Sequence, residues 1–199
     1  MFLGIYNPPA AISFLGIMLS STAIYLSFNN HFNYAVICFI YAGICDLFDG
    51  LIARKFDRTE EEKLFGVQID SIIDMASFGI TPCMLILHSG FDTKPDLFLI
   101  LFYICAAAMR LAYFNVHGTK EIKGTAFYTG LPVTFSALIF PSVFILHDMA
   151  CENLYRFIVR SVFFIVAVLF VLKISIPKPK GIFYFVFLLL AIFYTVYWL

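Results

Sequence analysis

Four aspartates stand out because they lie within apolar segments of the sequence. Asp46 and Asp49 are three residues apart, and Asp70 and Asp74 are four apart, so each pair occupies one face of a helix. Carboxylates at bilayer depth are costly and usually functional. Hard divalent cations such as Mg²⁺ or Mn²⁺ prefer carboxylate oxygens, and pairs of such ions commonly serve phosphoryl chemistry. If the two helices pack side by side, their aspartates predict a metal site in a membrane-embedded transferase.

Small and basic residues accompany these aspartates. Gly50 and Ala53 share the face of the first pair, Gly66 shares that of the second, and Arg54 lies one residue round from the first face. The small side chains would let a nucleotide approach the helix backbone, and Arg54 has the fork geometry that suits a phosphate. Small residues on membrane helices are equally typical of close helix packing, so both interpretations stay open.

A structural role and a cation transporter are the alternatives to an enzyme. A purely structural role suits a single buried aspartate better than four of them in two helical pairs. A cation transporter would spread acidic residues along a path through the membrane, and the other apolar segments have none at mid-depth. We therefore favour an enzyme and keep the transporter as a remote alternative.

The composition identifies the class of protein. Of 199 residues, 62% are hydrophobic and 13% are charged, and the mean hydropathy is +0.93. Repeated long apolar runs predict an all-α, polytopic transmembrane helical bundle, which we treat as a single domain over 1–199. The net charge is zero, which argues against a nucleic-acid partner. About seven spans are expected, at 9–28, 33–56, 63–88, 95–115, 130–147, 154–173 and 181–199.

Local signals mark two helix starts. Pro8 and Pro9 suit the opening turn of the first span. Thr59, with Glu62 three residues later, predicts a capping box at the start of the third span. Polar loops are expected at 116–130, before the fifth span, and at 173–181, before the seventh.

Lysine and arginine are distributed unevenly between alternate loops. With the N-terminus inside, the outer segments hold three of these residues, namely Lys94, Arg156 and Arg160. The inner segments hold ten, namely Arg54, Lys55, Arg58, Lys63, Arg110, Lys120, Lys123, Lys173, Lys178 and Lys180. Because basic residues accumulate on the cytoplasmic side of membrane proteins, this bias predicts that the aspartates lie near the cytoplasmic face of the cell membrane.

The aspartate segment resembles the signature of the CDP-alcohol phosphotransferases, DxxDGxxARx(n)GxxxDxxxD. All eight defined positions match, and they are Asp46, Asp49, Gly50, Ala53, Arg54, Gly66, Asp70 and Asp74. The connection between the two halves is longer than is usual in the family, since eleven residues separate Arg54 from Gly66. The extra residues fall in the loop KFDRTEEEK, so they leave both helix faces unchanged.

The resemblance implies a site with two divalent ions, Mg²⁺ or Mn²⁺, that grip the pyrophosphate of a CDP-linked lipid. It implies that Asp46, Asp49 and Asp70 are metal ligands. Asp74 would complete the metal site and act as general base on the acceptor hydroxyl. The remaining matches would contact the CDP moiety together with Asp46, namely Gly50, Ala53, Arg54 and Gly66. The family also implies a core of six helices, to which the seventh span is an addition, and a homodimer.

Flanking residues resemble one subfamily, the membrane-bound phosphatidylserine synthases of bacteria and archaea. The segments that carry this likeness are FGVQIDSIIDMASFGITP, MRLAYFNV and YTGLPVTFSAL. Tyr113 departs from it, because the subfamily often has a basic residue there. The likeness implies CDP-diacylglycerol, or its archaeal ether-lipid equivalent, as donor and L-serine as acceptor. Inositol, inositol phosphate, glycerol phosphate or choline stays open as an alternative acceptor.

A serine pocket needs a cation for the carboxylate and acceptors for the ammonium group. Arg110, near the inner end of the fourth span, is the candidate cation, although it would also serve as an interfacial anchor. Asn115, Ser77 and Thr81 are candidate polar contacts. The two hydroxyl residues have an alternative, because Ser and Thr in membrane helices often bond to their own backbone.

Overall fold

The structure is a computed structural model that describes residues 4–5, 7–53, 55–122, 125–178 and 181–199. It is dominated by helices, and this confirms the predicted all-α bundle. The α-helices are α1 (Pro8–Phe28), α2 (Phe32–Ala53), α3 (Glu60–Asp74), α4 (Thr81–His88), α5 (Lys94–His117), α6 (Ser136–Phe144), α7 (Glu152–Val171) and α8 (Ile182–Trp198).

Short 3₁₀ and π segments extend some of these helices. A π-helical turn, Met75–Ile80, joins α3 to α4, so that Glu60–His88 is one continuous rod. Short 3₁₀ turns flank α6, and together they form the apolar segment Val133–His147. Each of the seven predicted spans therefore coincides with a helical segment. The second helix ends at Ala53, earlier than the predicted 56, and residues 55–59 are not helical.

Five helical segments in the described part of the chain are long and apolar enough to cross a membrane. The segments Val133–His147 and Tyr184–Trp198 are apolar but shorter. Many large apolar side chains also point outward, as Phe98 does with 74% of its surface exposed. Water would disfavour such a surface and lipid would not, so the chain is a multi-pass membrane protein.

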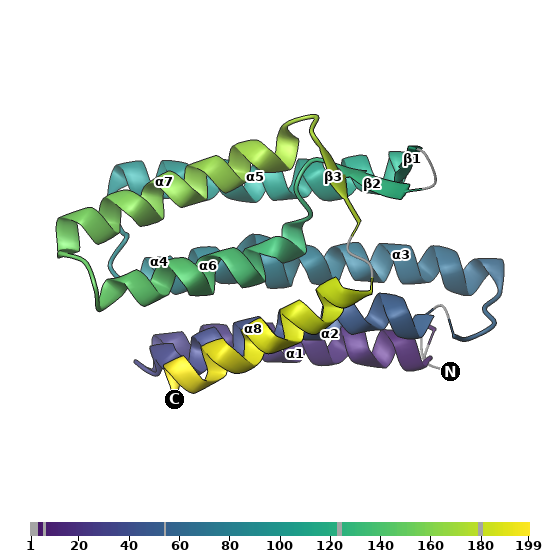
Figure 1. The fold of residues 1–199 in the computed structure, drawn as a ribbon, viewed down its shortest axis with the longest axis horizontal. Coiled ribbons are helices and arrows are strands. Elements are labelled where there is room, and N and C mark those ends of the chain that lie inside the picture. The colour runs from purple at the N-terminus through teal and green to yellow at the C-terminus, as the bar shows by residue number, and fades with distance from the viewer. Residues whose placement is uncertain (1–3, 6, 54, 123–124, 179–180) are drawn as a thin grey trace.

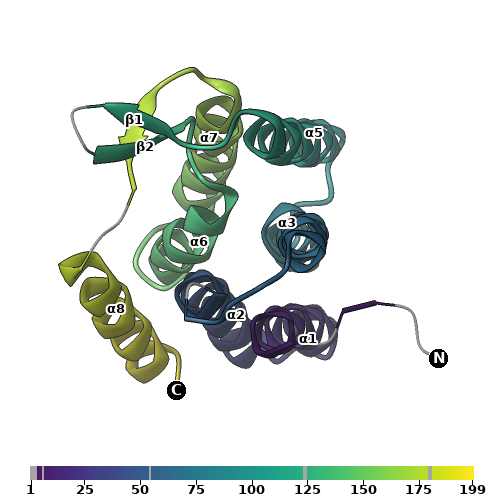
Figure 2. The same cartoon turned by 90° about the vertical axis from the view of Figure 1, so that its right-hand side faces the viewer.

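The helices run side by side along the long axis of the molecule (Figure 1). The start of α1, the α2–α3 connection and a small sheet lie at one end, and the α4–α5 and α6–α7 connections lie at the other (Figure 1). Viewed along the bundle, α8 lies at its edge beside α2 (Figure 2). The α2–α3 connection and the loops before α6 and α8, which the charge bias assigned to the inner side, therefore lie at the same end of the bundle.

Side chains define the start of several helices. Asn7 accepts a 3.1 Å hydrogen bond from the backbone N–H of Ala10 and caps α1, whose first turn contains the two prolines. The predicted capping box is confirmed, because Glu62 accepts from the Thr59 N–H at 2.7 Å and Thr59 Oγ1 accepts from the Glu62 N–H at 3.2 Å. The box satisfies two backbone N–H groups at the start of α3, so it defines where the helix that carries Asp70 and Asp74 begins.

A three-stranded antiparallel sheet was not predicted. Strand β1 (Lys120–Ile122) pairs with β2 (Thr125–Thr129), and β2 pairs with β3 (Ser175–Pro177), with Tyr128 opposite Ile176. Both regions were expected to be plain loops. The sheet escaped prediction because β2 and β3 are far apart in sequence and each is too short to show a convincing alternation. It attaches the segment before α8 to the segment before α6.

Close contacts hold α5, α6 and α7 together in the core. Tyr103, Phe140 and Phe163 are fully buried, and their rings pack α5, α6 and α7 against one another. Gly130 has a positive φ of 80°, and a Cβ there would lie 2.7 Å from the carbonyl oxygen of Phe170. Only glycine satisfies both conditions, so the turn between β2 and α6 can lie directly on the end of α7.

Candidate active site

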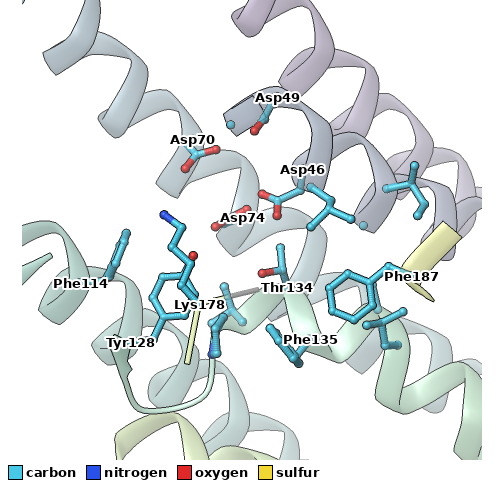
Figure 3. Close-up of a pocket in the computed structure, with 18 of the residues that line it drawn as sticks. Asp46, Asp49, Asp70, Asp74, Phe114, Tyr128, Thr134, Phe135, Lys178 and Phe187 are labelled. Carbon is cyan, nitrogen blue, oxygen red and sulfur yellow. The ribbon is translucent and has the colours of Figure 1, made fainter. Parts of the chain in front are cut away.

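Helices α2 and α3 bring the four aspartates to one cavity. Asp46 and Asp49 reach it from α2, and Asp70 and Asp74 reach it from α3 (Figure 3). The helical spacing of three and four residues explains this, since each pair projects from one face of its helix. The convergence that the sequence pattern required is therefore present.

The geometry of three of these carboxylates fits a metal ion. One oxygen each from Asp46, Asp49 and Asp70 lies within 4.8 Å of the others. Asp74 lines the same cavity, and its Oδ1 is buried with no hydrogen-bond partner among the described residues. Carboxylates this close repel one another unless a cation or a proton lies between them. An all-oxygen donor set of this kind is suited to a hard divalent cation.

A serine on α1 donates a hydrogen bond to one of the clustered aspartates. Ser13 Oγ donates a 2.6 Å hydrogen bond to Oδ2 of Asp49, and both side chains are buried. This bond fixes the rotamer of Asp49 and leaves its other oxygen for a ligand. Ser13 was missed in the sequence, although a buried stripe of small residues on α1 offered a signal, namely Ser13, Gly16, Ser20, Ala23 and Ser27.

The wall opposite the aspartates carries two cations. Arg110 from α5 is buried, donates from Nε to the Leu131 carbonyl at 3.0 Å and lies 5.2 Å from the centre of the Phe114 ring. Lys178 follows β3, and its backbone N–H donates to the Ala126 carbonyl of the sheet at 2.9 Å. Figure 3 shows its side chain extending toward the aspartates. The sheet thus positions a basic side chain over the cavity.

The remaining lining is largely apolar. Aliphatic and aromatic side chains from α2, from α6 with its preceding 3₁₀ turn, and from α8 complete it, among them Leu47, Phe135 and Phe187. A cavity with carboxylates on one wall, cations on the opposite wall and an apolar rim can take a metal-bound phosphate, a small polar molecule and lipid chains together.

Over residues 6–197 the sequence matches a known family, the CDP-alcohol phosphatidyltransferases. The chain belongs to this family. The match covers both halves of the aspartate signature and every helix that lines the cavity.

Several relatives in the family are similar over large parts of the chain. A CDP-diacylglycerol–serine O-phosphatidyltransferase of Methanocaldococcus jannaschii is 31% identical over 146 residues, which are 72% of this chain and 64% of that protein. An archaetidylserine synthase of Methanothermobacter thermautotrophicus is 31% identical over 175 residues, 87% of this chain and 70% of that protein. The CDP-diacylglycerol–serine O-phosphatidyltransferase of Saccharomyces cerevisiae is 34% identical over 101 residues, 48% of this chain and 36% of that protein. The matched region therefore spans less than two thirds of two of these three proteins.

Three of the five residues predicted to contact CDP line a second cavity, whereas Asp46 is in the described lining of the main cavity only. Gly50, Ala53 and Gly66 line it between α1, α2 and α3, on the other side of Asp49 and Asp70. Asp49, Asp70 and Gly50 line both cavities. Arg54 lies outside the described residues. Residues of the signature therefore line two cavities, and Asp49 and Asp70 are shared by both.

Of the four residues predicted to contact the acceptor, one lines the main cavity and three are not in its described lining. Arg110 lines the cavity, and Ser77, Thr81 and Asn115 are absent from its described lining. Thr81 bonds to the Ala76 carbonyl at 3.0 Å, the backbone alternative that its sequence position left open. Asn115 bonds to Ser71 at 2.8 Å on an exposed surface, and the Ser77 hydroxyl is buried in the π-helical turn.

Lys178 and Tyr128 line the cavity although neither was predicted to do so. Lys178 was counted only among the inner basic residues. Tyr128 was noted only as the first residue of the segment YTGLPVTFSAL, which resembles the phosphatidylserine synthases. The Lys178 ammonium lies 5.4 Å from the centre of the Tyr128 ring. Their approach depends on pairing between β2 and β3, so no local pattern could have found it.

Proposed function

We propose that this protein transfers a phosphatidyl group from a CDP-linked lipid to L-serine and releases CMP. The donor is CDP-diacylglycerol or its archaeal ether-lipid equivalent. The observation that carries the proposal is the convergence of Asp46, Asp49, Asp70 and Asp74 on one cavity with Arg110 and Lys178 opposite. Membership of the family and the names of the serine-specific relatives support the same reaction.

The carboxylates would hold two divalent ions, Mg²⁺ or Mn²⁺. Asp46, Asp49 and Asp70 are the proposed ligands, because their oxygens lie within 4.8 Å of one another, and Asp74 completes the set. Bound there, the ions would neutralise the donor pyrophosphate and stabilise CMP as a leaving group. The Ser13 hydrogen bond keeps Asp49 in the orientation that this requires.

Asp74 is the proposed general base. It is buried, and its Oδ1 has no hydrogen-bond partner within the described chain, so it can accept a proton from a bound hydroxyl. The serine oxygen then forms a bond to the phosphorus that carries the lipid, and the bond from that phosphorus to CMP breaks. The proton stays on Asp74 until it leaves to solvent.

Arg110 and Lys178 are the proposed partners of the serine carboxylate. The Nε of Arg110 is committed to Leu131, which fixes the plane of the guanidinium at the cavity wall. Lys178 lines the same cavity, and its side chain extends toward the aspartates (Figure 3). Two cations facing carboxylates suit a zwitterion, whose ammonium and carboxylate groups need partners of opposite sign.

We propose that the chain is one domain in the cell membrane, with the aspartates at the cytoplasmic face. The bias of ten basic residues against three in the sequence supports this orientation. The family resemblance also leads us to propose a homodimer, which mass measurement in detergent or nanodiscs would test.

The decisive experiment uses the purified protein with CDP-diacylglycerol, Mn²⁺ or Mg²⁺ and a panel of labelled alcohols. We expect CMP release that depends on the metal and on L-serine, with phosphatidylserine as the lipid product. CMP release with inositol or glycerol phosphate and none with serine would reassign the acceptor. No CMP release with any alcohol, together with cation flux in liposomes, would replace the enzyme with a transporter.

A further inference from the structure

The cavity between α1, α2 and α3 contains a charged side chain that the family signature does not include. Arg58 lies in the connection between α2 and α3 and turns back to line this cavity with Gly50, Ala53 and Gly66. The connection is the part of the chain that is longer than the family pattern. Arg58 thus brings a guanidinium into the lining of a cavity that Asp49 and Asp70 also line.

The guanidinium lies against the backbone of α3 at Gly66. A Cβ built on Gly66 would lie 3.4 Å from Nη1 of Arg58, which is ordinary van der Waals contact, so the arginine packs directly on this face of α3. The Nε of Arg58 is buried, and it has no hydrogen-bond partner in the described part of the chain. A buried guanidinium N–H without a partner is uncommon and costly, because the group has lost water without a replacement.

Nearby acidic groups do not account for this side chain. Glu62 is close enough to interact electrostatically with Arg58, but its Oε2 already accepts from the N–H and Oγ1 of Thr59. Asp49 and Asp70 line the same cavity, and Oδ2 of Asp49 accepts from Ser13. No ion pair joins Arg58 to any of these carboxylates among the described residues. Arg58 thus lines the cavity beside Asp49 and Asp70 without an ion pair among the described residues.

We propose that Arg58 binds the nucleotide of the lipid donor through a phosphate oxygen. The small residues of the cavity let the nucleotide approach the helices, and the planar guanidinium pairs with anionic oxygens. This inference rests on the proposed function for the identity of the nucleotide, and it concerns a residue outside the shared signature. Arg58 is a substrate-binding residue and plays no part in proton transfer.

The test measures binding of free CDP to the purified full-length protein in the presence of Mn²⁺, before any acceptor is added. We expect Arg58→Ala to weaken CDP binding roughly tenfold or more, as loss of a charge-assisted hydrogen bond does, and Arg58→Lys to weaken it less. Lys55→Ala is the matched control, because Lys55 lies in the same connection and is exposed. In turnover, the KM for the donor should rise while the KM for serine stays constant.

Other outcomes overturn the inference in distinguishable ways. If Arg58→Ala binds CDP as the parent does, Arg58 does not contact the nucleotide. A lower melting temperature with unchanged CDP affinity would make the residue a support for the start of α3. If the parent protein binds no CDP at all, the proposed function fails together with the inference. CDP binding that depends on Arg58, alongside activity with an alcohol other than serine, would support the inference and correct only the acceptor.

Discussion

Ser13 on α1 and Asp49 on α2 are joined by a 2.6 Å hydrogen bond at the back of the carboxylate cluster. The serine hydroxyl also lies 3.2 Å from the Pro9 carbonyl of its own helix, which is a second acceptor for it. The bond therefore couples the first helix, which carries no charged residue, to the chemistry on the second. It also explains why a helix without signature residues belongs to the site.

Replacing Ser13 with alanine should weaken metal binding. The substitution removes the donor that orients Asp49, and loss of such supporting contacts typically lowers metal affinity about 10–100-fold. We expect the Mn²⁺ concentration for half-maximal CMP release to rise within that range, with recovery of most activity at saturating Mn²⁺. Ser20→Ala is the control, because Ser20 is also buried on α1 and its hydroxyl has no hydrogen-bond partner in the described chain. An unchanged Mn²⁺ dependence for Ser13→Ala would contradict the role.

Replacing Asp74 with asparagine should abolish turnover and largely spare donor binding. Asparagine keeps the shape of the side chain but cannot accept the hydroxyl proton, and loss of a general base typically costs about 10²–10⁴-fold in rate. Metal-dependent CDP binding and the rate of CMP release would be measured on the same preparation. Asp57→Asn, in the exposed α2–α3 connection, is the control for removing a carboxylate. Full activity of Asp74→Asn would exclude it as the base.

The sequence predicted the parts of this site that follow from helix periodicity. The spacing of Asp46, Asp49, Asp70 and Asp74 determines which face each occupies, and a bundle of apolar helices leaves few ways to bury those faces. The capping box at Thr59 was equally local, since both partners lie within one turn.

The opposite wall could not be predicted in the same way. Lys178 reaches the cavity because β3 pairs with β2, and these strands are separated by α6 and α7. Short strands with non-local partners carry little local signal. Arg110 was proposed as an acceptor contact from its place near the inner end of an apolar span, and it lines the cavity.

Replacing Lys178 with methionine should impair the use of serine specifically. Methionine keeps the apolar stem and removes the charge proposed to hold the serine carboxylate, so we expect the KM for serine to rise roughly tenfold, or ~1.4 kcal/mol. The KM for CDP-diacylglycerol should not change, and Lys178→Arg should retain part of the serine affinity. Lys173→Met is the control, because Lys173 lies in the same segment outside the described lining of the main cavity. An equal rise in both KM values would instead indicate a general disturbance of the sheet.

The contact between α2 and α6 allows a test by compensation. A Cβ on Gly43 would lie 2.6 Å from the Cβ of Ala137, so the two helices can approach this closely only with glycine at one of the positions. Both residues line the main cavity, and Gly43 lies three residues before Asp46 on α2. Any displacement of α6 would therefore change the shape of the cavity.

We expect Gly43→Ala to lower both the melting temperature in detergent and the rate of CMP release, although alanine is the better helix former by about 1 kcal/mol. Ala137→Gly in the same chain removes the opposing methyl group, so the double variant should recover most of the lost activity. Ala137→Gly alone should cost only its helix propensity. The quantity to measure is the coupling energy of the double-mutant cycle, which should be clearly favourable. If the effects of the two substitutions simply add, positions 43 and 137 are not coupled. The close approach of α2 and α6 would then not determine the shape of the site.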